Sequence, residues 1–324
     1  MNPLNRRRLL ALVGGAAIGR LRAAHADERM RRVGILAPFT GPLAEPHMAA
    51  FRERLAQLGW SEGRNLQIDG RWQTGDGLTE ALARELVALS PDVIVSQSMQ
   101  ALRLLQAVDR TIPVVAAQVG DLVRWGMVDN PGHPAGNVTG FTLAEYSIGG
   151  KWLEWLEAIA PRTARVAYIH YPGFRGFLSA INARASDLRV EVTTAPVRNA
   201  ADITAAIDAF AREPNGGLIV NPHPVTGAHG DVIIALAARH GLPAMYPYRA
   251  FVEAGGLISY GTDPVEHRRR AAGYVDLILR GARPADLPVQ SPTKIELAIN
   301  LRTAKALGLA VPPRLLAGAD AVVQ

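Results

Sequence analysis

Residues 90–102, SPDVIVSQSMQAL, decide the fold of this chain. Residues 92–95 form a short apolar run rich in β-branched side chains, which predicts a buried strand. Three small polar residues follow, and apolar side chains then recur at helical spacing over residues 99–108. A buried strand that leads through polar residues into an amphipathic helix is the repeating unit of parallel α/β sheets.

The same alternation of strand and helix extends in both directions from this stretch. It indicates a parallel sheet whose strands are joined by right-handed crossover connections. As far as residue 142, the pattern predicts further strands at 33–37, 65–72, 113–117 and 138–141, and helices at 44–58, 79–89 and 99–108.

The pattern then restarts and predicts a second unit of similar size, opened by a helix at 151–160. Its strands are predicted at 165–170, 190–195, 217–220 and 243–246, and its other helices at 177–188, 200–212 and 231–239. A strand at 256–260, a helix near 268–279 and a tail remain. This remainder is too short for a third lobe, so we expect it to return and complete two α/β lobes.

The residues that follow each predicted strand are the candidate site, because open parallel sheets bind ligands beyond the carboxyl ends of their strands. Ser96, Gln97 and Ser98 follow the strand at 92–95 and can offer hydroxyls and backbone N–H groups to a carboxylate or other anion. The start of the helix adds a partial positive charge. The alternative is a plain helix cap, because serine is a favoured N-cap residue.

Other candidates lie near the ends of neighbouring strands. Gln118 can orient a polar ligand and Asp121 can meet an ammonium group, although Asp121 can equally cap a turn. Asn221 and His223 stand in a rigid Asn-Pro-His-Pro loop, for which a turn without further role is the alternative. Tyrosines gather near other strand ends and suit either a binding pocket or half-buried packing; they are Tyr146, Tyr171, Tyr246, Tyr248 and Tyr260.

The charge distribution argues against a nucleic-acid partner. The formal net charge is +6, but a group of arginines lies before Asp27, the first acidic residue of the chain. Without that segment the chain is close to neutral, and it has no basic stripe.

Residues 1–26 have the form of an export signal. Arg6, Arg7 and Arg8 precede an apolar segment of eleven residues, and Ala24-His25-Ala26 fits a cleavage site of small residues. The paired arginines suit the twin-arginine route, and an ordinary secretory signal is the alternative. We expect cleavage near Ala26, a location in the periplasm and no membrane span elsewhere in the chain.

Motifs of known catalytic chemistry are missing from the sequence. It contains no G-x-S-x-G, no G-x-x-x-x-G-K-[ST], no G-x-G-x-x-G after a predicted strand and no H-E-x-x-H. The chain has no cysteine, which excludes disulfides and thiolate metal sites. We therefore expect a binding protein without cofactor or metal rather than an enzyme.

Five blocks of the sequence resemble the ABC transporter substrate-binding protein family related to tryptophan/tyrosine-binding proteins. They occur in order between about residues 33 and 313, and they read FRERLAQLGWSEGRNLQIDGRW, ELVALSPDVIV, GNVTGFTLAEYSIGGKWLEWLEAIAPR, FAREPNGGLIV and LPVQSPTKIELAINLRTAKALGLAVP. The resemblance implies the type I periplasmic binding protein fold, in which two Rossmann-like lobes hold the ligand in a cleft. It also implies three hinge crossings, near 141–146, 251–256 and 286–291.

By positional analogy with amino-acid-binding members, the resemblance implies that residues 96–98 and 117–121, including Ala117, hold the polar head of the ligand. Residues of the second lobe, here Tyr171, Asn221 and Tyr246, would then close over it. Three cleft positions depart from the family's pattern: Leu122 replaces a proline, Tyr171 replaces the asparagine of a turn, and His223 replaces an acid. Loss of that acid disfavours an ordinary α-amino acid as the ligand.

Together these observations predict a monomeric periplasmic solute-binding protein that captures a small organic solute, amino-acid-like, aromatic or carboxylate, and delivers it to an ABC permease at the inner membrane. The alternatives are an exported sensory subunit for a membrane receptor and, less favoured, a periplasmic α/β enzyme. After the signal at 1–26, the first lobe is predicted at 27–142 plus 256–286 and the second at 143–255 plus 287–324. The predicted ligand-binding residues are Ser96, Gln97, Ser98, Ala117, Gln118, Asp121, Tyr146, Tyr171, Asn221 and Tyr246.

Overall fold

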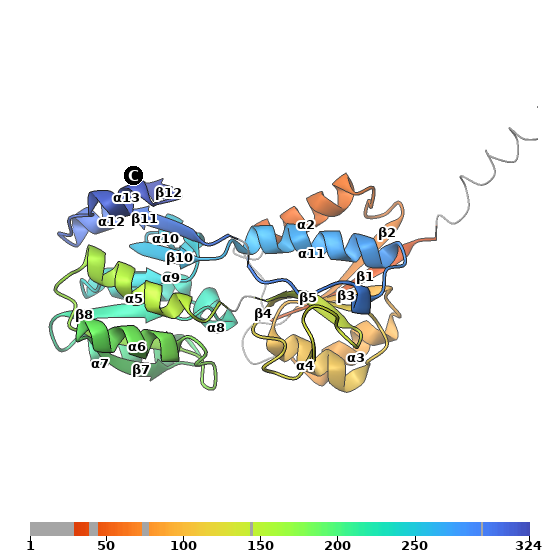
Figure 1. Ribbon diagram of the computed structural model, residues 1–324, viewed down its shortest axis with the longest axis horizontal. Helices are drawn as coiled ribbons and strands as arrows, with labels where there is room; N and C mark the ends of the chain where they lie inside the picture. The colour runs from red at the N-terminus through yellow and green to blue at the C-terminus, as the bar shows by residue number, and fades with distance from the viewer. Residues whose placement is uncertain (1–28, 39–44, 73–77, 143–144, 293) are drawn as a thin grey trace, which may run out of the picture.

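Two α/β lobes lie side by side in the computed structural model (Figure 1). The structure describes residues 29–38, 45–72, 78–142, 145–292 and 294–324. The predicted export signal at 1–26 lies outside these ranges. Within them, no helix is both long and apolar enough to cross a membrane.

The first lobe is built on a parallel sheet of five strands in the order β2-β1-β3-β4-β5. The strands are β1 (Arg31–Ala37), β2 (Leu66–Trp72), β3 (Val93–Ser96), β4 (Val114–Val119) and β5 (Val138–Thr142). β3 is buried along its whole length between β1 and β4, which explains why its sequence is a continuous apolar run rather than an alternating one.

Two pairs of helices cover the two faces of this sheet. On one face, α2 (Glu45–Gln57) packs beside α11 (Pro264–Leu279), although more than 200 residues separate them in the sequence (Figure 1). On the other face lie α3 (Glu80–Ala88) and α4 (Met99–Val108). The first lobe is therefore completed by a helix from the C-terminal part of the chain.

The second lobe contains a sheet of seven strands in the order β12-β11-β10-β9-β8-β6-β7, of which only the β10–β11 pair is antiparallel. These strands are β6 (Arg165–His170), β7 (Glu191–Pro196), β8 (Gly216–Val220), β9 (Ala244–Tyr246), β10 (Ile258–Gly261), β11 (Glu296–Asn300) and β12 (Ala321–Val323). The prediction of an α/β fold with two Rossmann-like lobes is confirmed.

Helices cover both faces of the second sheet as well. One face carries α5 (Ile148–Ile159), α6 (Leu178–Leu188), α12 (Leu301–Ala306) and α13 (Pro313–Ala317). The other carries α7 (Ala200–Phe210), α9 (Gly230–Arg239) and α10 (Arg249–Glu253). A further short helix, α8 (Pro224–Ala228), follows β8 directly.

The chain crosses between the lobes three times, and two crossings lie later in the sequence than predicted. β10 pairs with β9 and β11, so residues 258–261 belong to the second sheet and the second crossing follows them instead of falling at 251–256. Gln290 still exchanges hydrogen bonds with Gly140 and Thr142 of β5, so the third crossing follows residue 290 and the second lobe cannot resume at 287. An apolar run predicts a strand but not the sheet that the strand joins.

Candidate functional site

A cavity of about 2220 Å³ lies between the lobes and is lined by both. Residues that follow β3, β4, β6 and β8 line it, so the cavity lies at the carboxyl ends of both sheets. Pockets that hold a small molecule measure roughly 300–1,000 Å³. The cavity is therefore a wide cleft, and a small ligand cannot fill it as it stands.

The first lobe contributes a wall of polar and cationic side chains. We call Gln97, Ser98, Arg103, Gly120 and Trp125 the first wall. Ser98 is the N-cap of α4, and its Oγ accepts a hydrogen bond from the backbone N–H of Ala101 at 3.0 Å. Gln97 is only 5% exposed, and its Nε2 contacts Met48 Sδ at 3.6 Å. A thioether is a weak acceptor, so the described residues satisfy this side-chain amide poorly.

Arg103 and Trp125 form a stacked pair within the first wall. The guanidinium carbon of Arg103 lies 4.5 Å from the centroid of the Trp125 ring. Arg103 makes no ion pair with any acidic residue in the described part of the chain. The indole Nε1 of Trp125 is buried and has no hydrogen-bond partner among the described residues.

The second lobe contributes a wall of aromatic rings. We call Tyr146, Tyr171, Phe174 and His223 the second wall. The rings of Tyr171 and His223 are stacked, with centroids 4.3 Å apart and planes 11° apart, and Phe174 lies 5.7 Å from His223. His223 is also the N-cap of α8, where its Nδ1 accepts from the Val225 N–H at 3.2 Å.

The two walls touch at one end of the cavity. A Cβ atom on Gly120 would lie 3.3 Å from the hydroxyl of Tyr146 and 3.7 Å from the ring of Phe174. The backbone N–H of Asp121 donates to the Tyr146 hydroxyl at 3.4 Å. Burial raises the pKa of Tyr146, so this hydroxyl stays protonated at neutral pH.

A basic cluster lies near the second crossing. His47 and Tyr248 line the cavity, whereas His267 and Arg268 are buried. Burial, together with the positive charge of Arg268, lowers the pKa of both histidines to about 4, and Arg270 contributes to this lowering at His267. Burial also lowers the pKa of Arg268 to about 9, so it remains charged at neutral pH. The carboxylate of Asp263 acts in the opposite direction on both histidines while it caps α11.

Four predicted site residues line the cavity: Gln97, Ser98, Tyr146 and Tyr171. Asp121 does not line it, because its Oδ1 accepts from the backbone N–H groups of Val123 and Arg124 at 3.0 Å each and caps a turn. The side chain of Gln118 lies outside what the structure describes.

The other four predicted residues are buried behind the cavity walls. Ser96 donates its hydroxyl to the Ser98 carbonyl at 3.1 Å, and Ala117 is part of the core of the first lobe. Asn221 accepts from the Tyr168 hydroxyl at 3.0 Å, and Tyr246 stacks on Phe251 at 5.1 Å. Their side chains support the walls instead of forming them.

Sequence reasoning missed Arg103, Trp125 and Phe174 as cavity residues. Arg103 lies on the same helix as Ser98, so it could have been found by extending the site one turn along the expected helix. No local signal marks Trp125 or Phe174, which lie in irregular segments after β4 and β6. Among the described residues, no group of histidines and acids could hold a metal ion.

The fold and the cleft define a two-lobe ligand-binding protein. The family model of the ABC transporter substrate binding protein matches residues 32–323, and the chain belongs to this family. It is thus a binding protein rather than an enzyme, which confirms both the resemblance in the sequence and the class predicted from it.

Named relatives and solved structures agree with this assignment. A tyrosine-binding protein of Clostridioides difficile is 22% identical over 293 residues, which cover 87% of this chain and 82% of that protein. A conserved domain protein from Vibrio cholerae superposes with a TM-score of 0.81 at 25% identity, covering 91% of this chain and all of that one. An ABC domain from Streptococcus pneumonia in complex with L-Trp gives 0.81 at 21% identity, covering 90% and 99%.

Proposed function

We propose that the protein captures a small organic solute between its lobes in the periplasm and delivers it to an ABC permease at the inner membrane. The observation that carries the proposal is the cavity, which is lined by both lobes at the carboxyl ends of their strands. The sequence of residues 1–26 supports export. A tyrosine-binding relative, a related structure that holds L-Trp and the aromatic second wall support an amino-acid-like, aromatic or carboxylate ligand.

Capture works by closure of the two lobes about the three crossings. The cavity of about 2220 Å³ is larger than a small ligand, so a bound ligand gains further contacts with both walls when the lobes approach. Binding then shifts the population towards the closed form. A ligand must favour the closed form by about 5 kcal/mol to move the protein from mostly open to mostly closed.

Native mass spectrometry of protein purified from the periplasm tests this function directly. A small molecule that co-purifies identifies the solute, and a thermal-shift screen of amino acids, aromatic acids, small carboxylates and sugars should show stabilisation that grows with ligand concentration. Small-angle scattering should then show a smaller radius of gyration with the ligand that stabilises most. No bound mass and no stabilisation across the panel would contradict the proposal.

A further inference from the structure

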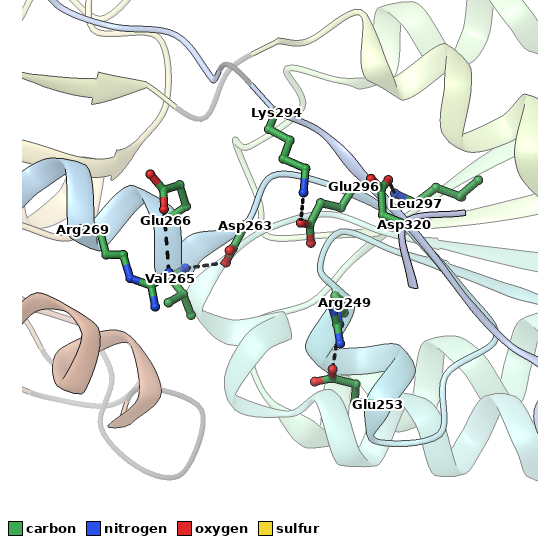
Figure 2. Close-up of polar contacts among 10 residues, drawn as sticks. All are labelled: Arg249, Glu253, Asp263, Val265, Glu266, Arg269, Lys294, Glu296, Leu297 and Asp320. Atoms are coloured by element: carbon green, nitrogen blue, oxygen red, sulfur yellow. Dashed lines mark hydrogen bonds and ion pairs between the residues drawn. The ribbon is translucent and has the colours of Figure 1, made fainter. Parts of the chain in front are cut away.

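The acidic side chains of the cavity are poorly placed to receive a cation. In the described chain, four acids line it: Asp231, Glu253, Asp263 and Glu296. The two half-buried ones are already engaged: Glu296 pairs with Lys294 at 2.7 Å, and Asp263 accepts from the Val265 N–H at 2.7 Å (Figure 2). Of the two exposed ones, Glu253 pairs with Arg249 at 2.7 Å, also drawn in Figure 2.

Asp231, the remaining acid, lies exposed on the first turn of α9. Exposed ion pairs contribute little to binding because water and salt screen them. Of the stretches between the described ranges, only 73–77 contains an acid, Asp76. The described cavity therefore offers no buried carboxylate without a partner to an ammonium group.

The cavity is better supplied with positive charge and with hydrogen-bond donors. Arg103 faces the cavity without an acidic partner among the described residues, and the charge of Arg268 reaches His47 and Tyr248 on its lining. The Ser98 hydroxyl accepts from Ala101 but donates to no described residue, so its proton is available. Gln97 is more than nine-tenths buried, and among the described residues its side-chain amide N–H has only the sulfur atom of Met48 as a partner. These are donors suited to a carboxylate.

The shape of the lining points to a flat group beside that carboxylate. Trp125 lies on the first wall, and the stacked pair of Tyr171 and His223 lies on the second. Aromatic rings bind other rings face to face or edge to face, with a large apolar contact area for each. The lobes already touch near Gly120, so closure narrows the space between these rings.

Resting on the proposed function, we propose that the ligand is an aromatic carboxylate that carries no ammonium group. Ser98, Gln97 and Arg103 bind its carboxylate, and its ring lies between Trp125 and the Tyr171–His223 stack. An amino acid of the same skeleton binds less well, because its ammonium group loses water without gaining a carboxylate partner.

Titration calorimetry with matched ligands tests this selectivity. We expect phenylpropionate to bind at least about tenfold more tightly than L-phenylalanine, and hydroxyphenylpropionate more tightly than L-tyrosine by a similar factor. The uncharged phenylpropionamide should bind more weakly than either acid. Equal or tighter binding of the amino acids overturns the inference but leaves the proposed function intact. If none of these compounds binds, the inference also fails, and the broad screen above decides the function separately.

A pair of variants at His223 isolates the effect of charge. His223→Asp and His223→Asn both keep an acceptor for the Val225 N–H, but only the first adds a carboxylate to the second wall. For each variant, the affinity for L-phenylalanine is divided by the affinity for phenylpropionate. We expect this ratio to be about tenfold higher in H223D than in H223N. An unchanged ratio between the two variants overturns the inference.

Arg103 provides an independent test on the exposed surface of α4, where substitution leaves the core intact. We expect Arg103→Gln to weaken phenylpropionate binding about tenfold and Arg103→Lys to retain most of it. Unchanged affinity in R103Q removes this side chain from the carboxylate site and overturns that part of the inference.

Discussion

The first and second walls of the cavity are built alike, but their residues differ in how easily they can be predicted from the sequence. In both lobes the residue that reaches the cavity is the N-cap of the helix that follows a strand: Ser98 before α4, His223 before α8 and Tyr248 before α10. Serine is a favoured cap, whereas histidine and tyrosine are not. Ser98 could therefore be predicted as a cavity residue from its sequence, whereas the predicted Asn221 and Tyr246 lie two residues before His223 and Tyr248, which line the cavity.

Asn221 and Tyr246 were predicted to bind the ligand, but they have structural roles instead. Asn221 is fully buried, and its amide bridges the Tyr168 hydroxyl and the Phe174 carbonyl, which holds the loop that carries the second wall. Tyr246 stacks on Phe251 of α10 within the core of the second lobe. In this protein the polar Asn221, directly after a buried strand, supports the cavity wall instead of forming it.

The largest expected effect concerns Gly261 of β10, which lines the cavity. In Gly261→Ala the new Cβ would lie 1.9 Å from the carbonyl oxygen of Pro247, a backbone atom that cannot move away alone. We expect a loss of about 3 kcal/mol in the free energy of unfolding, measured by urea titration.

Gly120→Ala is the matched control on the first wall. Its nearest neighbour would be the Tyr146 hydroxyl at 3.3 Å, at the end of a side chain that can shift. We expect a loss below about 1 kcal/mol. Equal losses in the two variants would show that the structure accommodates a methyl group equally well at both positions.

The second prediction tests whether Asn221 supports the second wall or binds ligand. Asn221→Ala leaves the buried Tyr168 hydroxyl without its acceptor, so we expect a loss of about 2 kcal/mol in the free energy of unfolding. Tyr171→Ala removes a half-buried ring of the cavity lining and should weaken ligand binding with a smaller effect on unfolding. If N221A keeps the wild-type free energy of unfolding but binds the ligand more weakly, Asn221 contacts the ligand directly.

The smallest expected effect is the loss of stability when His267 of the basic cluster is protonated. The pKa of His267 is about 4 in the folded protein and near 6.5 in the unfolded chain. The unfolded state therefore binds more protons between these pH values, and stability falls as the pH drops from 6.5 towards 4. We expect this residue to account for roughly 1–2 kcal/mol of that loss.

Urea unfolding of the wild type and His267→Gln, at neutral pH and near pH 4.5, measures this contribution. Other groups titrate in both proteins, so the difference between the two losses belongs to His267. The variant should lose less stability on acidification. Identical losses would mean that His267 takes up its proton without disturbing the fold, in spite of Arg268 and Arg270 nearby.

The sequence by itself determined the order of strands and helices up to α11, except for the short helices α8 and α10, and it did not predict the elements after α11. Helix Met99–Val108 and strand Arg165–His170 begin and end where the sequence predicts, because periodicity and β-branched runs are local properties. It also indicated Ser98 as a cavity residue, since a serine cap is recognisable wherever it occurs, but it did not indicate Arg103 or Trp125.

Tertiary structure alone decided the rest. The assignment of β10 to the second sheet, the union of α2 with α11 and the meeting of Trp125, Tyr146 and Phe174 around Gly120 join residues far apart in the chain. Periodicity gives the face of an element that is buried but not the element that buries it. Both the crossings and the contacts around Gly120 depend on that choice of partner, so only the folded chain defines them.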